Sequence, residues 1–436
     1  MARGKKKESA LTPEEKLAQA LIPVEEQPYQ VPGNWCWIRQ NSICSLSDGE
    51  KNINEFFPYW EVKALRGTKE LQYVSAGKFV YQGSKVILVD GENSGEVFDI
   101  PADGYMGSTF KALQMSPIVH WDYLRFFIST KQELYRNNKK GSAIPHLNKE
   151  LFFNMPLPLA PISEQQRIVE RIEYLFAKLD EAKEKAQSAL DSFETRKAAI
   201  LHKAFTGELT AKWRAEHGVD QKSWRQLTLS QCASKIGDGL HGTPSFSDDG
   251  EFYFVNGNNF AGQCLEIKPD TKKVSVAEYE KHKIPLFKDV TVFVSINGTL
   301  GKTAFYNDEP VVLGKSACYV HVTDDLNKFF LRYYFETKEF VDYANAMATG
   351  STIKNLGLKA MRNMPMLIPG MDEQVEIINI LDSLFAKEQQ AKNAAEAVLE
   401  KIDLLKKSIL ARAFRGELGT NDPNEDSAVE LLKQVL

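Results

Sequence analysis

Residues 163–209 read SEQQRIVERIEYLFAKLDEAKEKAQSALDSFETRKAAILHKAFTGEL, and residues 372–418 repeat this segment with substitutions at a constant offset of 209. Extended back to residue 154, the two copies share 22 identities in 56 aligned positions without a gap. Upstream, Gly141-Ser142-Ala143-Ile144 aligns with Gly350-Ser351-Thr352-Ile353 at the same offset. A repeat of this length indicates that one structural unit occurs twice. We therefore expect the order module, long segment, module, long segment.

Both long segments are predicted to be helices. In residues 168–204 and 377–413, apolar residues recur mostly in alternating steps of three and four, which is the pattern of a coiled-coil seam. Forty-odd residues rising about 1.5 Å each make a rod of roughly 60 Å. Because such a rod cannot bury its apolar stripe alone, and because a module returns the chain between the copies, we expect antiparallel packing. The alternative is that each helix covers only its own module.

Each predicted helix has a start signal and a stop signal. Ser163 and Asp372 each stand before an acidic residue and are expected as N-caps. Gly207 and Gly416 follow the last predicted turns, where glycine commonly ends a helix.

The modules are predicted to be mixed α/β. Residues 85–89, 290–294 and 317–322 are rich in strand-forming side chains, whereas 123–134 and 329–343 have the pattern of amphipathic helices. The expected fold class is α+β, with two related mixed α/β domains in tandem, separated by two long helices that form an antiparallel coiled coil. The expected boundaries are an N-terminal arm (1–32), a first module (33–155), a central helical region (156–220), a second module (221–364), a distal helical region (365–418) and a C-terminal tail (419–436).

The composition is that of a soluble globular protein, since 43% of the 436 residues are hydrophobic and 26% are charged. No apolar run is long enough to span a membrane or to act as a secretory signal, so the cytoplasm is the expected location. The five cysteines are dispersed and odd in number, which favours buried reduced thiols over disulfides. The net charge of −4 implies that any DNA binding is local or depends on a partner.

Several catalytic patterns can be rejected. Gly298-Thr299-Leu300-Gly301-Lys302-Thr303 resembles a phosphate loop, but two residues rather than four separate its glycines, and a strand-like segment follows. Residues 269–272 faintly resemble a nuclease motif but lack a second carboxylate spaced for a metal ion, so a solvated turn is expected. The seven histidines show no metal-ligand spacing. We expect neither a catalytic residue nor a metal site.

Two divergent modules on one rigid spacer could bind two different stretches of a linear polymer, and duplex DNA is the polymer for which such spacing matters most. Loops at 238–244, 256–259 and 295–299 are rich in Asn, His, Ser and Thr, which can hydrogen-bond base edges and phosphates. For any single residue the alternative is a solvated turn. The candidate DNA-binding residues are Arg66, Lys69, Lys78, Lys111, Lys139, Lys140, Ser142, His241, Gly242, Thr243, Asn256, Asn258, Asn259, Asn297, Thr299, Lys302, Lys315, Ser351 and Lys354.

The ends of the twin segments carry a family resemblance. Ser163-Glu164-Gln165-Gln166-Arg167-Ile168-Val169 begins the first segment, and Ala204-Phe205-Thr206-Gly207-Glu208-Leu209 ends it, as Ala413-Phe414-Arg415-Gly416-Glu417-Leu418 ends the second. Together these motifs strongly resemble the specificity subunit of Type I restriction-modification systems, called HsdS. The loop from Gly239 to Pro244 is similar to one common in the recognition domains of this family.

The resemblance implies two target-recognition domains, each reading one half of an asymmetric bipartite site in double-stranded DNA, with a spacer set by the helices. It also implies that two methyltransferase subunits dock on the helices and methylate adenine N6 with S-adenosylmethionine. Two motor-nuclease subunits would add restriction that depends on ATP and Mg²⁺. None of these cofactors is expected to bind this chain, and no membrane partner is expected. The candidate partner-binding residues are Glu164, Gln165, Phe205, Gly207, Glu208, Leu209, Glu373, Gln374, Phe414, Gly416, Glu417 and Leu418.

The sequence departs from the family pattern in three places. The first module has no clear equivalent of residues 241–244, the second Gly-Glu-Leu continues as Gly419-Thr420-Asn421, and residues 1–30 match nothing in the pattern. The competing hypothesis is a coiled-coil scaffold whose modules bind proteins or glycans rather than DNA. A scaffold of this kind would show no salt-dependent association with DNA.

Overall fold

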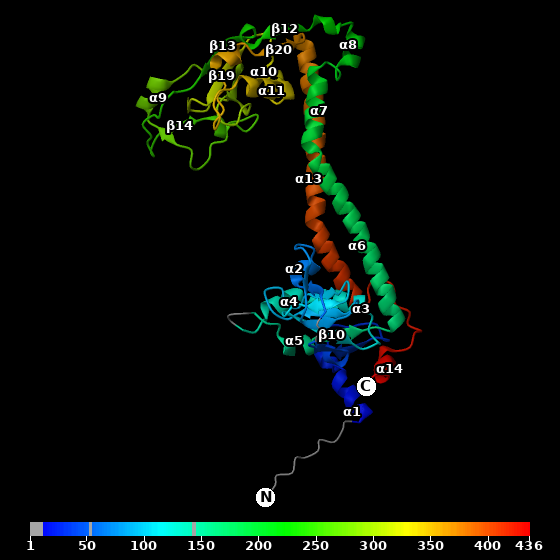
Figure 1. The fold of residues 1–436 in the computed structure, drawn as a ribbon. Coiled ribbons are helices and arrows are strands. Elements are labelled where there is room, and N and C mark those ends of the chain that lie inside the picture. Colours follow the sequence, from blue (N-terminus) through cyan, green and yellow to red (C-terminus); the bar gives the residue numbers. More distant parts are fainter. Residues whose placement is uncertain (1–11, 52–54, 142–144) are drawn as a thin grey trace. The chain divides into compact units, whose positions relative to one another are not determined.

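The computed structural model describes residues 12–51, 55–141 and 145–436 of the chain (Figure 1). The chain divides into two compact units. Unit 1 contains residues 1–186 together with 397–436, and unit 2 contains residues 187–396. The end of the chain therefore folds with its beginning.

Unit 1 is built around three sheets. In the two-stranded sheet, β1 (Cys36–Arg39) pairs antiparallel with β11 (Pro156–Leu159). The four-stranded sheet has the order β2 (Cys44–Ser47), β10 (Phe110–Met115), β7 (Lys85–Leu88) and β8 (Val97–Asp99). The five-stranded sheet has the order β3 (Glu50–Lys51), β6 (Lys78–Val80), β9 (Gly104–Met106), β4 (Phe57–Trp60) and β5 (Gln72–Val74).

The helices of unit 1 outside the long segments are short. They are α1 (Pro13–Ala20), α2 (Val62–Leu65), α3 (Trp121–Thr130), α4 (Gln132–Asn137), α5 (Lys149–Phe153) and α14 (Ala428–Lys433). The tail packs on the N-terminal arm, where the Lys16 ammonium donates to the Leu436 carbonyl at 2.7 Å, and on the start of the first module, where the Ala428 amide donates to the Asn34 carbonyl at 2.9 Å. The side chain of Asn34 donates in turn to the carbonyl of Asp422 at 2.9 Å.

Unit 2 repeats most of this plan. In its two-stranded sheet, β12 (Arg225–Thr228) pairs antiparallel with β20 (Pro365–Ile368). Its four-stranded sheet has the order β13 (Ala233–Asp238), β19 (Ala317–Val322), β16 (Thr291–Ser295) and β17 (Thr303–Phe305). The third sheet has three strands rather than five, β15 (Lys273–Val274), β14 (Phe252–Val255) and β18 (Val311–Leu313). Its shorter helices are α8 (Ala211–His217), α9 (Val276–His282), α10 (Lys328–Tyr334), α11 (Lys338–Met347) and α12 (Leu358–Arg362).

Two predicted helices are divided. The predicted helix at 123–134 is divided at Lys131 between α3 and α4, and the one at 329–343 is divided between α10 and α11. In unit 2 the cause is visible, because the buried Thr337 accepts a hydrogen bond from the Phe340 amide and so starts a new helix.

The long segments form α6 (Ile162–Asp191), α7 (Phe193–Phe205) and α13 (Met371–Ala413). The second copy is one continuous helix, as predicted, but the first is interrupted at Ser192, where the Ser192 hydroxyl donates to the Ser188 carbonyl at 2.8 Å. The predicted N-caps are also wrong by a residue or more. Since α6 begins at Ile162 and α13 at Met371, Ser163 and Asp372 lie inside the first turns.

The helix ends agree with the prediction, since Gly207 has φ +78° and Gly416 has φ +74°, values that favour glycine.

Within each unit the two long helices pack against each other. In unit 2 the ammonium of Lys392 lies 5.0 Å from the ring centroid of Phe193, and the guanidinium of Arg196 contacts Glu388 at 2.9 Å. In unit 1 the ammonium of Lys406 pairs with Asp180 at 2.6 Å. In unit 2 the residue numbers rise on one helix as they fall on the other, which confirms the expected direction there.

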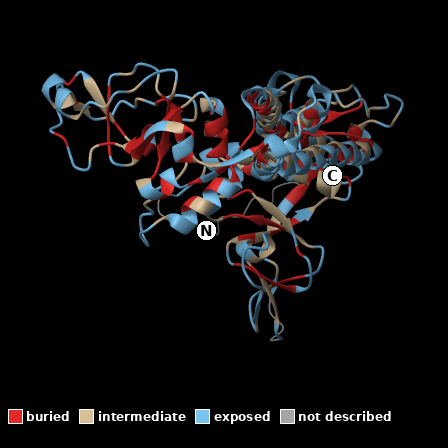
Figure 2. Cartoon of the chain, turned by 90° about the horizontal axis from the view of Figure 1, so that it is seen from above, coloured by how far each residue is buried: buried red, intermediate tan, exposed pale blue. Residues whose placement is uncertain are grey.

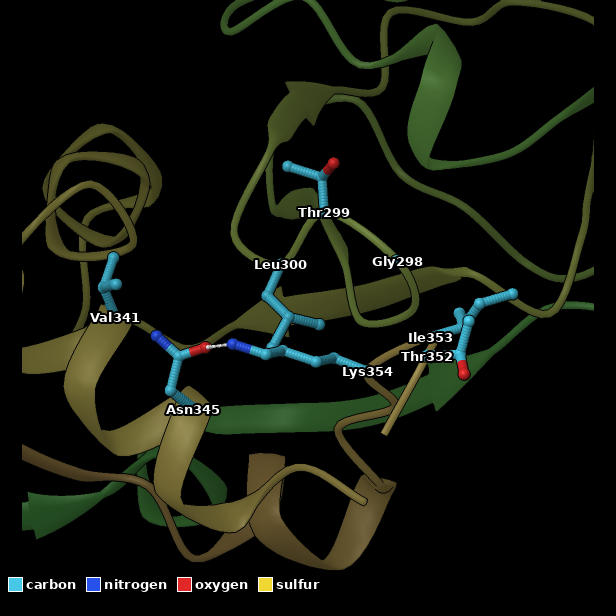
Figure 3. Close-up of a pocket in the computed structure, with 8 residues that line it drawn as sticks. All are labelled: Gly298, Thr299, Leu300, Val341, Asn345, Thr352, Ile353 and Lys354. Atoms are coloured by element: carbon cyan, nitrogen blue, oxygen red, sulfur yellow. Dashed lines mark hydrogen bonds between the residues drawn. The ribbon is translucent and has the colours of Figure 1, made fainter. Parts of the chain in front are cut away.

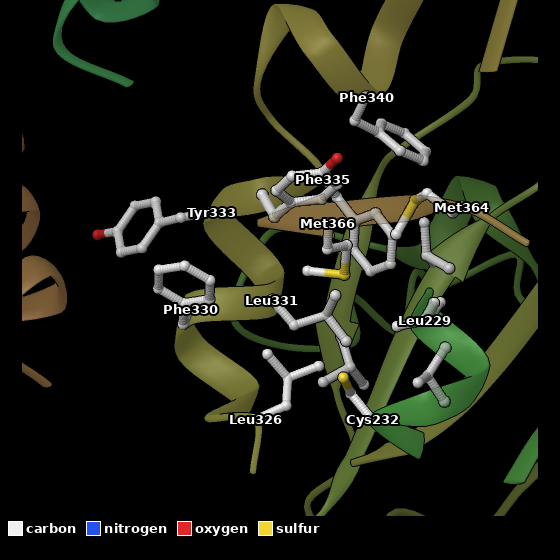
Figure 4. Close-up of a cluster of buried hydrophobic side chains, with 14 of the residues drawn as sticks. Leu229, Cys232, Leu326, Phe330, Leu331, Tyr333, Phe335, Phe340, Met364 and Met366 are labelled. Atoms are coloured by element: carbon white, nitrogen blue, oxygen red, sulfur yellow. The ribbon is translucent and has the colours of Figure 1, made fainter. Parts of the chain in front are cut away.

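Each unit has its own hydrophobic core. In unit 2 the side chains of Leu331, Phe335 and Met366 belong to one buried cluster with Cys232 and Leu229 (Figure 4). Burying each large apolar side chain contributes roughly 1.5–3 kcal/mol. Buried residues gather on the strands and the helices that face them, whereas the long helices carry mostly exposed and intermediate residues (Figure 2).

Four of the five cysteines are buried, but Cys264 is exposed, which corrects the expectation that all five thiols are buried. Within the described ranges, none of the helices is long and apolar enough to cross a membrane.

Candidate nucleic-acid interface

In unit 2, polar loops that follow four different strands are tied together. The Leu240 amide, in the loop after β13, donates to the Leu313 carbonyl at the end of β18 at 2.7 Å. The Gly314 amide after β18 donates to the Val255 carbonyl at the end of β14 at 2.8 Å. The Gly257 amide after β14 donates to the hydroxyl of Ser316 at 3.1 Å. These bonds bring two of the predicted loops, 238–244 and 256–259, and the turn after β18 to one edge of the sheets.

The fourth loop joins β16 to β17 and contains the rejected phosphate-loop pattern. The Ser295 hydroxyl accepts from the Lys302 amide at 2.9 Å and donates to the Thr299 carbonyl at 2.6 Å, which closes the loop into a tight hairpin. A strand follows Lys302 rather than a helix, so the rejection is confirmed. The side chains of Thr299 and Lys302 are exposed.

A cavity of about 410 Å³ lies beside this hairpin (Figure 3). The segment 352–354 forms one side, and Val341 and Asn345 of α11 form another. The ammonium of Lys354 donates to the Asn345 amide oxygen at 2.5 Å (Figure 3). The Ile353 side chain is 64% exposed. Amide and ammonium groups next to exposed apolar carbons can contact both the polar edges of bases and the methyl group of thymine.

The loop after β13 contains residues 239–244, the segment that resembles a loop of the family's recognition domains. His241 is exposed, and its ring nitrogen Nε2 lies 2.6 Å from the Asp238 carboxylate. Gly242 and Thr243 are also exposed, and a side chain at Gly242 would meet open space. Their exposure leaves the backbone of this loop free to approach a ligand.

The three asparagines after β14 play different parts. Asn259 is buried, and its amide donates to the Glu266 carbonyl at 3.0 Å, so it stabilises the loop. The Asn256 side chain accepts from the Asn258 amide at 3.0 Å. Asn258 is exposed, and with Lys302 it lines a second cavity of about 420 Å³. Of the three, only Asn258 therefore presents its side chain fully to solvent.

The other candidates of unit 2 lie close to the same loops. Lys315 is exposed in the turn after β18, and Ser351 is exposed beside Lys354. Asn297 forms an isolated β-bridge with Asn355, and its side-chain oxygen is buried without a partner among the described residues. The second-module candidates predicted from the sequence thus lie on neighbouring loops of unit 2.

The basic candidates of the first module instead form salt bridges with acidic neighbours. The pairs are Arg66 with Glu96, Lys69 with Glu61, Lys78 and Lys111 with Asp48, Lys139 with Glu92, and Lys140 with Glu150. The two lysines beside Asp48 lower the pKa of that carboxyl to about 2. Ser142 lies outside the described residues. Exposed ion pairs of this kind are weak, so a DNA phosphate could exchange with the carboxylates.

The internal repeat extends into these loops. In unit 1, His146 forms isolated β-bridges with Asp90 and Lys140, and in unit 2 Asn355 forms them with Asn297 and Thr349. His146 and Asn355 are 209 positions apart, so the offset of the aligned helices continues here. In unit 1 the His146 ring nitrogen Nδ1 lies 2.6 Å from the Asp90 carboxylate. The same loop framework therefore carries different side chains in the two units.

Sequence reasoning did not select Asp90, His146, Asn345 or Asn355. The offset of 209 could have indicated His146 and Asn355, because it runs without a gap from residue 141. No sequence signal identifies Asn345, since it reaches Lys354 from another element.

The Glu-Gln pairs near the start of the two long helices are buried. The Gln165 side chain accepts from the His120 amide at 2.8 Å and donates to the carbonyls of Ile118 and Ala160. Gln374 makes the equivalent contacts in unit 2, accepting from the Asn327 amide at 2.8 Å. Each glutamine thus fastens a long helix to the module beside it.

The adjacent glutamates are buried too. Glu373 accepts from Arg214 and Thr210 at 2.6 Å and from the Trp224 indole at 2.9 Å. Glu164 accepts from Thr420 at 2.7 Å and from Arg167 at 2.8 Å. Because these two glutamates and two glutamines are at most 2% exposed, a partner cannot reach their side chains in this structure.

The helix ends are only partly accessible. Phe205 and Phe414 are buried, Leu209 and Leu418 are half-buried, and Glu208 and Glu417 are exposed. Gly207 is buried, and Gly416 lies against Pro32, so that a Cβ there would come within 2.4 Å. Among the twelve predicted partner-binding residues, Glu208 and Glu417 are thus the most accessible.

The tail supplies contacts that the second Gly-Glu-Leu motif lacks. Glu425 accepts from Arg167 and from the Ser163 hydroxyl, and Thr420 donates to Glu164. The hydroxyl of Thr420 therefore donates a hydrogen bond to Glu164 in unit 1, as the hydroxyl of Thr210 does to Glu373 in unit 2. Among the described residues, we find no cluster of His, Cys, Asp and Glu able to hold a metal ion.

Both halves of the chain are similar in sequence to known proteins. Residues 35–190 and 235–401 match the Type I restriction modification DNA specificity domain. The EcoKI specificity subunit of Escherichia coli K12 is 24% identical over 393 residues, covering 84% of this chain and 82% of that protein. The StySPI specificity subunit of Salmonella potsdam is 24% identical over 364 residues, covering 80% and 76%.

Two solved structures share the fold. The HsdS subunit from Thermoanaerobacter tengcongensis is 19% identical with a TM-score of 0.64, covering 91% of this chain and 100% of that one. A chain from a study of complex assembly and conformational transition of the type I R-M system is 21% identical with a TM-score of 0.61, covering 90% and 100%.

The expected fold class, two mixed α/β domains in tandem with long helices, is confirmed by these likenesses. The expectation of a recognition subunit rather than an enzyme is confirmed by the relatives, since both are specificity subunits. With two matched segments that cover more than half of its length, the chain belongs to the Type I restriction modification DNA specificity domain family, as a specificity subunit with two such domains.

Proposed function

We propose that each module reads one half of an asymmetric, bipartite site in double-stranded DNA. The observation that carries this proposal is the loop framework that occurs in both units with different side chains, Asp90 and His146 in one and Asn297 and Asn355 in the other. One framework with two sets of donors and acceptors suits the recognition of two different half-sites. We assign the recognition domains to residues 33–155 and 221–364.

In the second module the reading surface is formed by the loops at 239–244, 256–259, 296–302, 314–316 and 349–355. Direct base contacts are assigned to the exposed members His241, Asn258, Thr299 and Lys354. Buried Asn259 holds its loop in shape. In the first module the ion-paired lysines would exchange carboxylates for DNA phosphates, and this exchange makes binding sensitive to salt.

The long helices are proposed to set the gap between the half-sites. They are also proposed to dock two methyltransferase subunits, which would methylate adenine N6 with S-adenosylmethionine. Two motor-nuclease subunits using ATP and Mg²⁺ would join through them. The exposed Glu208 and Glu417 are the better contacts for docking, whereas the buried Glu164, Gln165, Glu373 and Gln374 would position the helices.

The test is to co-express the chain with its candidate methyltransferase subunit in a host without adenine methylation and to map modified adenines by single-molecule sequencing. We expect one asymmetric motif of two short blocks around a fixed gap. No modification, together with failure of the two proteins to co-purify, would favour the scaffold hypothesis.

A further inference from the structure

Unit 1 contains a basic cavity that the recognition loops do not use. Its volume is about 770 Å³, and it lies between α3, α4 and the last turns of α13. Its walls carry the basic residues Lys131, Arg136, Lys407 and Arg415 and one acidic residue, Glu133. We call this group the basic pocket. In a chain whose net charge is −4, a pocket with an excess of three positive charges is unusual.

The four cations of the basic pocket lack acidic partners. Among the described residues, none of them has a carboxylate within salt-bridge distance, although most other lysines and arginines of this module do. The ammonium of Lys131 lies 5.3 Å from the Phe127 ring centroid, and the guanidinium of Arg415 lies 5.4 Å from that of Tyr29. Burial lowers the pKa of Lys131, as expected for a cation that lacks a counter-ion.

The duplicated unit provides an internal control. At the offsets of the repeat, the four cations correspond to Lys338, Tyr343, Ala198 and Thr206. Three of the four charges are thus missing from unit 2, and the fourth is paired, since Lys338 contacts Asp342 at 2.5 Å. A cavity of about 370 Å³ at the corresponding place carries Glu339 instead. Because unit 2 builds the same helices without these cations, the fold does not require them.

The position of the pocket favours DNA as the source of the missing anion. Arg136 lies in the last turn of α4, three positions before Lys139 and four before Lys140. A duplex that contacts these two lysines would have its backbone close to α4. Guanidinium groups bind phosphate oxygens through paired hydrogen bonds, and lysines add point charges.

We propose that the basic pocket binds backbone phosphates of DNA flanking the half-site of the first module. This rests on the proposed function, because it requires the chain to bind duplex DNA. In the described part of unit 2 the corresponding positions lack these unpaired cations, so the two halves of the site are held with different strength. The first half-site is held partly by contacts that are independent of its sequence.

The experiment compares the full-length chain with the double variant Arg136→Gln/Lys407→Gln. The matched control is Lys281→Gln/Lys433→Gln, which removes the same charge from exposed lysines paired with Glu278 and Glu430. Binding to a fluorescein-labelled duplex of about 30 base pairs is measured by anisotropy over a range of salt concentrations. Thermal unfolding of each variant shows that it is folded.

Each phosphate contact contributes about 0.9 to the slope of log affinity against log salt, so the double variant should reduce the slope by about 2. Its affinity near 0.1 M salt should fall about tenfold or more, while the control retains the slope of the wild type. Inorganic phosphate should compete only weakly, because a single anion fills little of the pocket. An unchanged slope in the double variant would overturn the inference.

Two further outcomes would also overturn it. If the double variant loses binding to poly-glutamate but keeps the DNA slope, the pocket binds an acidic protein. If inorganic phosphate binds the wild type tightly and the double variant retains its DNA affinity, the ligand is a free phosphate. Failure of the wild type to bind any duplex at low salt, both alone and together with its methyltransferase partner, would remove the proposed function itself, which distinguishes the two failures.

Discussion

Gln165 fastens α6 to its module through three buried hydrogen bonds, so its replacement has a predictable cost. Gln165→Ala leaves the His120 amide and two carbonyls without partners. We expect the free energy of unfolding to fall by about 2–3 kcal/mol, as measured by chemical denaturation. Its neighbour Gln166 is exposed, so Gln166→Ala should change stability by less than about 0.5 kcal/mol. Equal effects of the two substitutions would contradict this assignment.

At the same scale, residue type was easier to predict than residue role. The sequence predicts the Glu-Gln pairs on a docking surface, whereas the structure buries them. A motif that occurs in both copies indicates that its residues have a role. One sequence does not distinguish residues that bind a partner from residues that hold a helix to its own module. The buried role of Gln374 depends on the Asn327 amide, which is 47 positions away in the chain.

Among the elements, the long helices give a test of the proposed spacer. Inserting four residues into both helices, near Ala186 and Ala395, adds about 6 Å along each. At about 3.4 Å per base pair, the gap in the methylated motif should grow by nearly two base pairs while both half-sites stay the same. Mapping of modified adenines measures the gap. An unaltered gap would show that the helices do not set it.

The tail is an element whose attachment should depend on pH. Arg167 donates to Glu425 and lowers the pKa of that carboxyl. A carboxyl with a lowered folded-state pKa adds stability that is complete above its unfolded-state pKa of about 4.3. That stability is lost as the pH falls through the lower value. Glu425→Gln should remove this part of the pH dependence and cost about 1 kcal/mol at neutral pH, as measured by unfolding at several pH values. If the variant keeps the acid sensitivity of the wild type, the pair does not hold the tail.

Element types were predictable where the pattern was long, and interruptions were not. The heptad pattern continues through Ser192, although α6 ends at Asp191 and α7 begins at Phe193. The interruption involves hydroxyl bonds to neighbouring carbonyls, which any exposed serine could make. Similarly, the division between α10 and α11 depends on a buried threonine cap that periodicity does not reveal.

For the molecule as a whole, the duplicated plan predicts that specificity can be exchanged by module. Replacing residues 33–150 with the equivalent segment of another family member should alter one half of the methylated motif and leave the other half and the gap unchanged. Mapping of modified adenines gives the result. A change in both halves would mean that the modules do not read independently.

The tandem organisation could be predicted from the sequence because the helices diverged little, whereas the module interiors diverged too far to align. One unit has a five-stranded third sheet where the other has three strands, and no repeat signal covers that region. The pairing of the C-terminal tail with the N-terminal arm is also not predicted by the sequence, since it depends on contacts such as that of Lys16 with Leu436.

The exposure of Cys264 offers a practical route into the recognition surface. The other four thiols are buried, and burial raises the pKa of Cys36 and Cys44 to about 12, so they react slowly with alkylating reagents. Cys264 follows the asparagine loop by five positions, and its carbonyl accepts from the Ala261 amide at 3.1 Å. A maleimide dye should therefore label the natural protein at one place, next to the loop assigned to base reading. Its fluorescence could then follow the arrival of a duplex in real time without any engineered cysteine.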